Sequence, residues 1–104
     1  MIFIETPVFT RQITALVNDD DYADFQRLLA NTPDAGDVIP GTGGLRKIRM
    51  AAHGHGKRGG ARVIYYHFTH ESQIALLLAY AKNEAEDLTP MQKKALKQVI
   101  EQWR

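Results

Sequence analysis

The side chains that could do chemistry are cationic, and they gather in the middle third of this 104-residue chain. Residues 38–70 hold six lysine and arginine side chains and no aspartate or glutamate, whereas residues 1–37 hold two basic and seven acidic side chains. Like charges repel one another, and a polyanionic partner is one good reason for a fold to tolerate that cost. A solvated basic face is the alternative explanation. The six cations are Arg46, Lys47, Arg49, Lys57, Arg58 and Arg62.

The spacing of these cations predicts a phosphate site. Residues alternate between the two faces of a strand, so Lys47 and Arg49 would share one face, opposite Ile48 and Met50. A guanidinium offers phosphate two parallel hydrogen bonds, and lysine offers a compact point charge. A lysine crowded by other cations has a lowered pKa, so it could accept a proton near neutral pH. Arg62 could stabilise the negative charge that builds up on a phosphorane.

Two loop histidines and three strand tyrosines are further candidates. His53 and His55 could exchange protons, because an unperturbed histidine titrates near about pH 6.5. They have no nearby carboxylate in the sequence, so we expect no metal site. Tyr65, Tyr66 and Tyr80 could stack on a nucleic-acid base. Packing within the sheet is the alternative role for these tyrosines.

The glycine-rich segment 54–59 matches the pattern G-x-G-x-x-G. The dinucleotide fingerprint needs a strand before this pattern, a helix after it and an acid about 20 residues further on. Here a strand is expected to follow, and position 74 is isoleucine. The segment therefore predicts a hairpin loop, and no cofactor is expected.

A strand and two helices are expected to precede the cationic segment. Residues 2–5 form a short apolar run typical of a strand, and Thr6-Pro7 suits an N-cap and first helical position. Asn18 and the acids after it would end the first helix and cap the second. Helical spacing predicts buried faces of Phe9, Ile13, Leu16 and Val17, and then of Tyr22, Phe25, Leu28 and Leu29. Two prolines and four glycines predict a loop over residues 31–44.

Three strands and a helix are expected to follow. The strands are predicted over residues 45–51, 61–69 and 73–81, and a short link makes the last two antiparallel neighbours. Residues 89–92 combine an N-cap, a proline and a capping-box glutamine. The helix that follows would bury Met91, Ala95, Leu96, Val99, Ile100 and Trp103, with Trp103 as a core anchor. The order of elements predicts an α+β fold with an antiparallel strand meander.

Composition limits the class of protein. The chain is 44% hydrophobic and 24% charged, which is typical of a globular domain, and 104 residues predict a single domain over residues 1–104. Without cysteine there is no disulfide or thiolate zinc site. No apolar run is long enough to span a membrane, and the first residues do not resemble a secretory signal. We therefore expect a cytoplasmic protein with no membrane partner.

Three segments together resemble the HigB branch of the RelE toxin superfamily. The resemblance extends over essentially the whole chain, including the first strand and the last helix. The segments that carry it are Gly36-Asp37-Val38-Ile39-Pro40-Gly41-Thr42-Gly43-Gly44-Leu45-Arg46-Lys47-Ile48-Arg49, Gly56-Lys57-Arg58-Gly59-Gly60-Ala61-Arg62-Val63-Ile64-Tyr65-Tyr66 and Tyr80-Ala81-Lys82-Asn83-Glu84.

The resemblance implies the toxin of a type II toxin–antitoxin system. Such toxins are small metal-independent endoribonucleases, or mRNA interferases, which cleave mRNA in the ribosomal A site and inhibit translation. The implied partners are mRNA on the ribosome, rRNA and a cognate antitoxin, often a helix-turn-helix protein. The implied reaction is attack of an RNA 2′-OH on the adjacent phosphate.

The resemblance also implies which residues act. Lys47, Arg49 and Arg62 match the family's basic pair and arginine, and Lys82 would substitute for a second arginine. The family's C-terminal tyrosine has no match here, so Lys47, a loop histidine and Tyr80 are all candidates for the general base. The expected RNA-binding side chains are Arg46, Lys57, Arg58, His55, Tyr66 and Tyr80. Alternatives are a non-catalytic domain that binds RNA or the ribosome, and an inactive relic that binds only the antitoxin.

Overall fold

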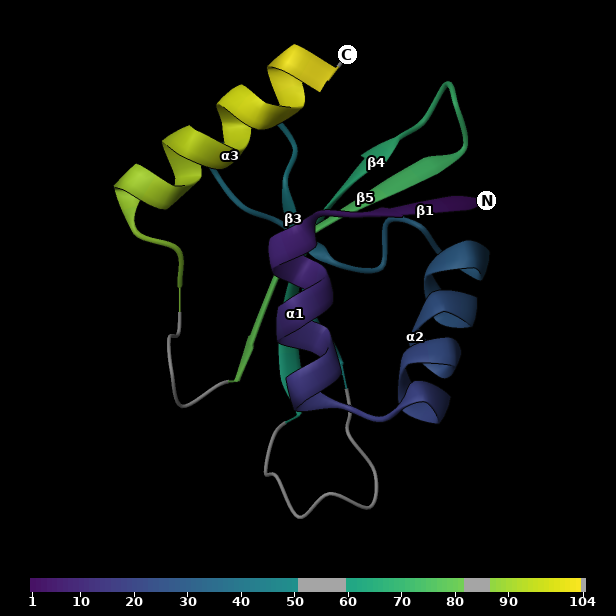
Figure 1. The fold of residues 1–104 in the computed structure, drawn as a ribbon. Coiled ribbons are helices and arrows are strands. Elements are labelled where there is room, and N and C mark those ends of the chain that lie inside the picture. Colours follow the sequence, from purple (N-terminus) through teal and green to yellow (C-terminus); the bar gives the residue numbers. More distant parts are fainter. Residues whose placement is uncertain (51–59, 82–86, 104) are drawn as a thin grey trace.

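The computed structural model describes residues 1–50, 60–81 and 87–103. A strand, two helices, a run of strands and a last helix follow one another as the sequence predicts, so the α+β fold is confirmed (Figure 1). In chain order they are β1 (Ile2–Glu5), α1 (Pro7–Leu16), α2 (Asp19–Asn31), β2 (Asp37–Val38), β3 (Arg46–Met50), β4 (Ala61–Phe68), β5 (Gln73–Ala81) and α3 (Pro90–Trp103).

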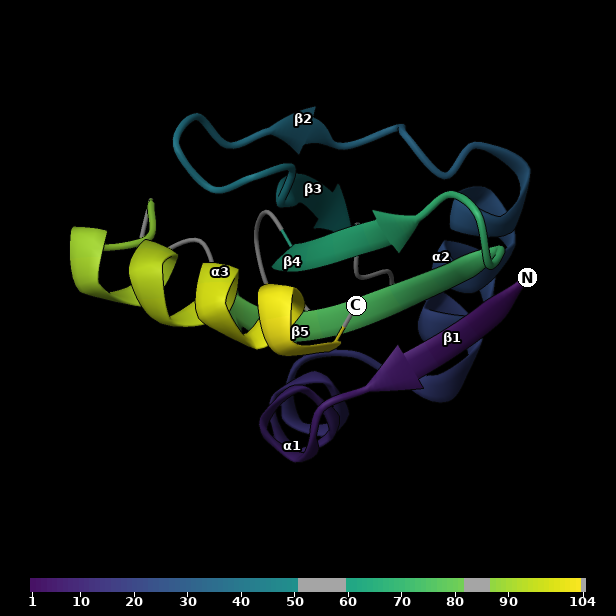
Figure 2. The ribbon, with the colours of Figure 1, turned by 90° about the horizontal axis from the view of Figure 1, so that it is seen from above.

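Five strands form one sheet in the order β1-β5-β4-β3-β2. The strands β2 to β5 pair antiparallel with one another, which confirms the predicted meander, and β1 joins the edge of β5 in parallel (Figure 2). The interior strands β4 and β5 are therefore largely buried on both faces, and the nearly continuous apolar sequence of β5 is typical of such a strand.

The two faces of the sheet bury different helices. Phe9 of α1 and Phe25 of α2 pack against Val63 and Tyr65 on one face. Ile100 of α3 packs with Ile64 on the other. Both views show α3 apart from α1 and α2 (Figures 1 and 2). Alternation along β4 thus sends successive residues into two separate cores.

The helices begin where local sequence chemistry predicts. The Thr6 hydroxyl accepts a hydrogen bond from the Phe9 amide at 3.0 Å, and Asn18 Oδ1 accepts one from the Asp21 amide at 2.7 Å. Before α3, Thr89 and Gln92 exchange side-chain to backbone hydrogen bonds in both directions, which is the expected capping box. All three predicted N-caps are confirmed.

The prediction of a loop over residues 31–44 is wrong in two respects. Asn31 is still the last residue of α2. The segment also contains the two-residue strand β2, which is too short to show a hydrophobic period and is held by pairing with β3.

The predicted apolar face of α2 is wrong at one position. Leu28 is 48% exposed, although its neighbour Leu29 is fully buried. The line of α2 that meets the sheet runs through Phe25 and Leu29, and Leu28 lies beside that line.

The apolar face predicted for α3 is also only partly buried. Ile100 is buried and Leu96 packs against the same core, whereas Met91 is 81% exposed and Val99 41%. Trp103, predicted as a core anchor, is 36% exposed and lies at the edge of the core against Phe68, with 5.7 Å between ring centroids. Periodicity identifies the apolar side of a helix, but the area of sheet surface opposite that side decides how many of its side chains are buried.

The neighbouring leucines of α2 provide a matched test of this packing. We expect Leu29→Ala to lower the free energy of unfolding by about 2–5 kcal/mol, because it leaves a cavity in the core. Leu28→Ala makes the same change at the exposed position and should cost less than about 1 kcal/mol. Urea unfolding of both variants measures the difference. Equal losses would contradict the packing of α2 described above.

Candidate phosphate-binding site

The pairing of β3, β4 and β5 aligns three polar side chains across the sheet. Arg49 lies directly opposite Arg62, and Arg62 lies directly opposite Tyr80. Directly opposed residues have Cβ atoms about 4.5–5.5 Å apart and project from the same face. We call these three residues the cross-strand row. Sequence reasoning expected Lys47, Arg49 and Arg62 to come together, and the strand pairing brings them to one face.

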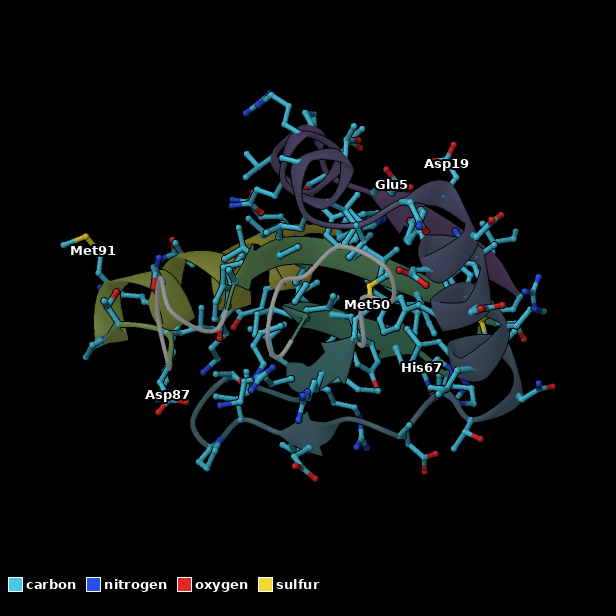
Figure 3. The ribbon with its side chains drawn as sticks, turned by 90° about the horizontal axis from the view of Figure 1, so that it is seen from below. Glu5, Asp19, Met50, His67, Asp87 and Met91 are labelled. Atoms are coloured by element: carbon cyan, nitrogen blue, oxygen red, sulfur yellow. The ribbon has the colours of Figure 1, made fainter. Side chains whose placement is uncertain are left out.

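This face is the one that α3 partly covers. The neighbours of Arg62 on β4, Ala61 and Val63, point into the core beneath α1 and α2, so Arg62 points the other way. Met50, the residue after Arg49, packs in the core beneath α1 and α2, so Arg49 projects from the other face (Figure 3). Arg49 is exposed and Arg62 is half-buried, so a ligand can reach these two arginines of the row.

Lys47 lies on this face two residues before Arg49 and makes an ion pair. Its Nζ lies 2.6 Å from Oδ1 of Asp87, a residue 40 positions later in the chain. The hydrogen bond to Asp87 raises the pKa of Lys47, and burial and the nearby Arg62 charge oppose this shift. The predicted lowering of the lysine pKa is therefore wrong in this arrangement, because the expected crowding by cations is outweighed by a carboxylate.

Tyr80 brings a buried hydroxyl to the row. The residue is 9% exposed, and its hydroxyl oxygen has no hydrogen-bond partner among the described residues. Burial raises the pKa of Tyr80, and the positive charges of Lys47 and Arg62 offset this only in part. Tyr80 and Lys47 therefore both hold their protons at neutral pH and can serve as donors.

Two of the other predicted RNA-binding residues lie away from the row. Arg46 projects from the opposite face, where its Nη1 donates hydrogen bonds to the backbone oxygens of Gly36 at 2.7 Å and Asp34 at 3.2 Å. Tyr66 lies further along β4, and its ring packs edge-on against Phe68. The remaining candidates, His55, Lys57, Arg58 and Lys82, lie outside the described residues.

Asp87 is the site residue that sequence reasoning missed. It follows β5 and directly precedes the buried Leu88 and the cap of α3, so the fold returns it to the beginning of β3. Figure 3 shows Asp87 near the start of α3. A signal existed in the sequence, because Asp87 follows shortly after the strand that carries Tyr80.

The arrangement has the composition of a phosphate-binding site. Three cations and a tyrosine hydroxyl on one rigid face can bind phosphate oxygens and stabilise charge that develops there. In residues 1–50, 60–81 and 87–103 no three histidine or acidic side chains group closely enough to hold a metal. A hollow of about 400 Å³ lined by residues 66–71 lies towards the other end of β4 and includes none of these cations.

Comparison with known families places most of the chain in one family. Residues 9–104 match the family described as the RelE toxin of the RelE / RelB toxin-antitoxin system. The match includes β3, β4 and β5, which carry Lys47 and the cross-strand row. No helix in the described part of the chain is long and apolar enough to cross a membrane.

The ion pair predicts a measurable titration. The pKa of Asp87 is lowered, first by its hydrogen bond to Lys47 and then by the charge of Lys47. The ion pair is therefore complete at neutral pH and is lost as the pH falls through the lowered pKa of Asp87. Carboxyl-resolved NMR should show the pKa of Asp87 move upwards in Lys47→Met. An unchanged titration in that variant would show that the pair does not persist in solution.

Proposed function

The chain belongs to the RelE toxin family and is therefore a toxin of a toxin–antitoxin system, and from this we propose that it is a metal-independent endoribonuclease that cleaves mRNA in the ribosomal A site. Cleavage there would inhibit translation. The observation that carries the proposal is the cross-strand row with Lys47 beside it, which gathers cations and a hydroxyl donor on one face. Two arginines directly opposite each other in adjacent strands can bind one phosphate together, because each guanidinium offers it parallel hydrogen bonds.

The proposed reaction is an intramolecular displacement at phosphorus. The RNA 2′-OH attacks the adjacent phosphorus, the bond from phosphorus to the 5′-oxygen breaks, and a 2′,3′-cyclic phosphate and a 5′-hydroxyl form. Lys47, Arg49 and Arg62 stabilise the charge on the phosphorane, because fixed cations there need no reorganisation. Tyr80, protonated at neutral pH, donates a hydrogen bond to a phosphate oxygen or a proton to the departing 5′-oxygen.

The proton of the 2′-OH needs an acceptor. Lys47 and Tyr80 were candidates for this general base, and the direction of both pKa shifts favours the donor role for each. Of the three candidates, the loop histidine, His55 or its neighbour His53, is then favoured on chemical grounds. Lys82, Lys57 and Arg58 would add phosphate contacts around the scissile bond.

We also propose the finer assignments that the resemblance implies. The quoted glycine-rich and basic segments favour the HigB branch, with residues 1–104 acting as one domain. The partners would be mRNA on the ribosome, rRNA and a cognate antitoxin with a helix-turn-helix fold. The action of the toxin would be cytoplasmic, where translating ribosomes are found. No cofactor takes part in the proposed reaction.

Arg62→Ala tests the proposed catalysis. We expect the cleavage rate on mRNA-programmed ribosomes to fall about a hundredfold or more, because a donor to the developing charge is lost. In cells, growth arrest and new 5′ ends at in-frame codon positions should disappear. The matched control is Arg11→Ala, which removes an exposed arginine from α1 and should leave both unchanged.

Two results of this experiment would contradict the proposal. Full toxicity of a stably expressed Arg62→Ala protein would remove Arg62 from the mechanism. Growth arrest by the unchanged protein without new RNA ends would favour a domain that binds RNA or the ribosome and does not cut.

Tyr80→Phe separates a chemical role from a structural one. The hydroxyl lacks a partner in the described structure, so its removal should leave the free energy of unfolding unchanged or slightly higher. The cleavage rate should nevertheless fall at least about tenfold, since a donor is lost. Urea unfolding and single-turnover cleavage measure the two effects. A stable variant with full activity would exclude the hydroxyl from the reaction.

A further inference from the structure

An acidic side chain lies against the cationic face. Asp87 Oδ1 is 2.6 Å from Lys47 Nζ, and the Asp87 side chain is 75% exposed while that of Lys47 is 32% exposed. The next residue, Leu88, is 8% exposed and packs in the core beneath α3. The backbone beside Asp87 is therefore anchored, and the carboxylate is held within reach of Lys47.

The contact fills a position that the proposed reaction needs. An ammonium group binds carboxylate and phosphate oxygens with the same charge-assisted geometry, so the Asp87 oxygen stands where a phosphate oxygen would bind. A phosphate that approaches Lys47 while Asp87 remains there meets a like charge. Exposed ion pairs contribute little to stability, so the contact can exchange without unfolding the protein.

We propose that Asp87 sets the affinity of this site for RNA, because its carboxylate occupies Lys47 in the free protein and a substrate phosphate must displace it. The inference rests on the proposed function, since it takes RNA as the ligand of the face. It adds a residue that acts through Lys47, and Asp87 is therefore a positioning residue that touches no reacting atom. RNA that is presented with many other contacts would displace it more readily than free RNA.

The test is binding of an RNA that cannot be cut. A single-stranded oligoribonucleotide with 2′-O-methyl groups lacks the nucleophile, and fluorescence anisotropy with the purified full chain reports its affinity. We expect Asp87→Asn to bind about two- to fivefold more tightly, the range given by exposed ion pairs. Asp87→Glu keeps the charge and should bind as the unchanged protein does.

Two controls separate a local effect from net charge. Glu71→Gln removes one charge from the turn between β4 and β5, at the opposite end of these strands from Arg62 and Tyr80, and should change binding less. In a Lys47→Met background, Asp87→Asn should give no gain, because the contact it releases is already absent. In the unchanged protein, the Asp87 carboxyl resonance should shift when the RNA is added.

The possible outcomes decide the inference separately from the proposed function. It is overturned if Asp87→Asn binds no more tightly than Glu71→Gln, if the gain persists without Lys47, or if neither protein binds the RNA. Tighter binding by Asp87→Asn, with no cleavage of ribosomal mRNA by the unchanged protein, would support the inference and contradict the proposed endonuclease. Cleavage of ribosomal mRNA by the unchanged protein, with no gain in RNA affinity for Asp87→Asn, would contradict the inference and support the proposed endonuclease.

Discussion

The register of β4 between β3 and β5 is the constraint on which both the core and the candidate site depend. Alternate residues of β4 enter two cores, so Val63 and Tyr65 pack beneath α1 and α2 while Ile64 packs beneath α3. A slip of one residue would exchange these faces. Arg62 would then enter an apolar core, and the burial of a charge forbids this. The hydrophobic pattern that secures the fold is thus the same feature that holds Arg62 between Arg49 and Tyr80.

A β-bulge between β4 and β5 separates the polar end of the sheet face that carries Arg62 from the apolar end of that face. Ile64 pairs with Leu78, but Tyr65 pairs with Leu76, so Leu77 is an extra residue in β5. The Thr6 hydroxyl, which caps α1, also donates to the Leu77 carbonyl at 2.9 Å. Bulges bend a strand and commonly lie beside functional sites. Here the bulge is tied to the first helix, which fixes where the regular pairing around Arg62 begins.

Local chemistry made much of this predictable. Thr6, Asn18 and Thr89 cap helices through contacts within three residues, and alternation places Lys47 and Arg49 together without knowledge of the fold. The predictions of burial that failed, for Leu28 and Trp103, share a different cause. The exposure of Leu28 and Trp103 depends on how much surface lies opposite each helix, which no periodicity contains.

Contacts between distant parts of the chain were the least predictable. Arg46 stands among the cations in sequence, yet its guanidinium holds the backbone at Gly36, and the buried Tyr65 hydroxyl accepts from the Gly36 amide at 2.8 Å. Asp87 is 40 residues from Lys47 and reverses the expected direction of its pKa shift. In the proposed reaction, this one carboxylate, which only the fold brings near, favours a donor role for Lys47 over an acceptor role. The proposed reaction then takes its proton acceptor from the remaining candidates, among which a histidine of the 53–55 segment has the appropriate ordinary pKa.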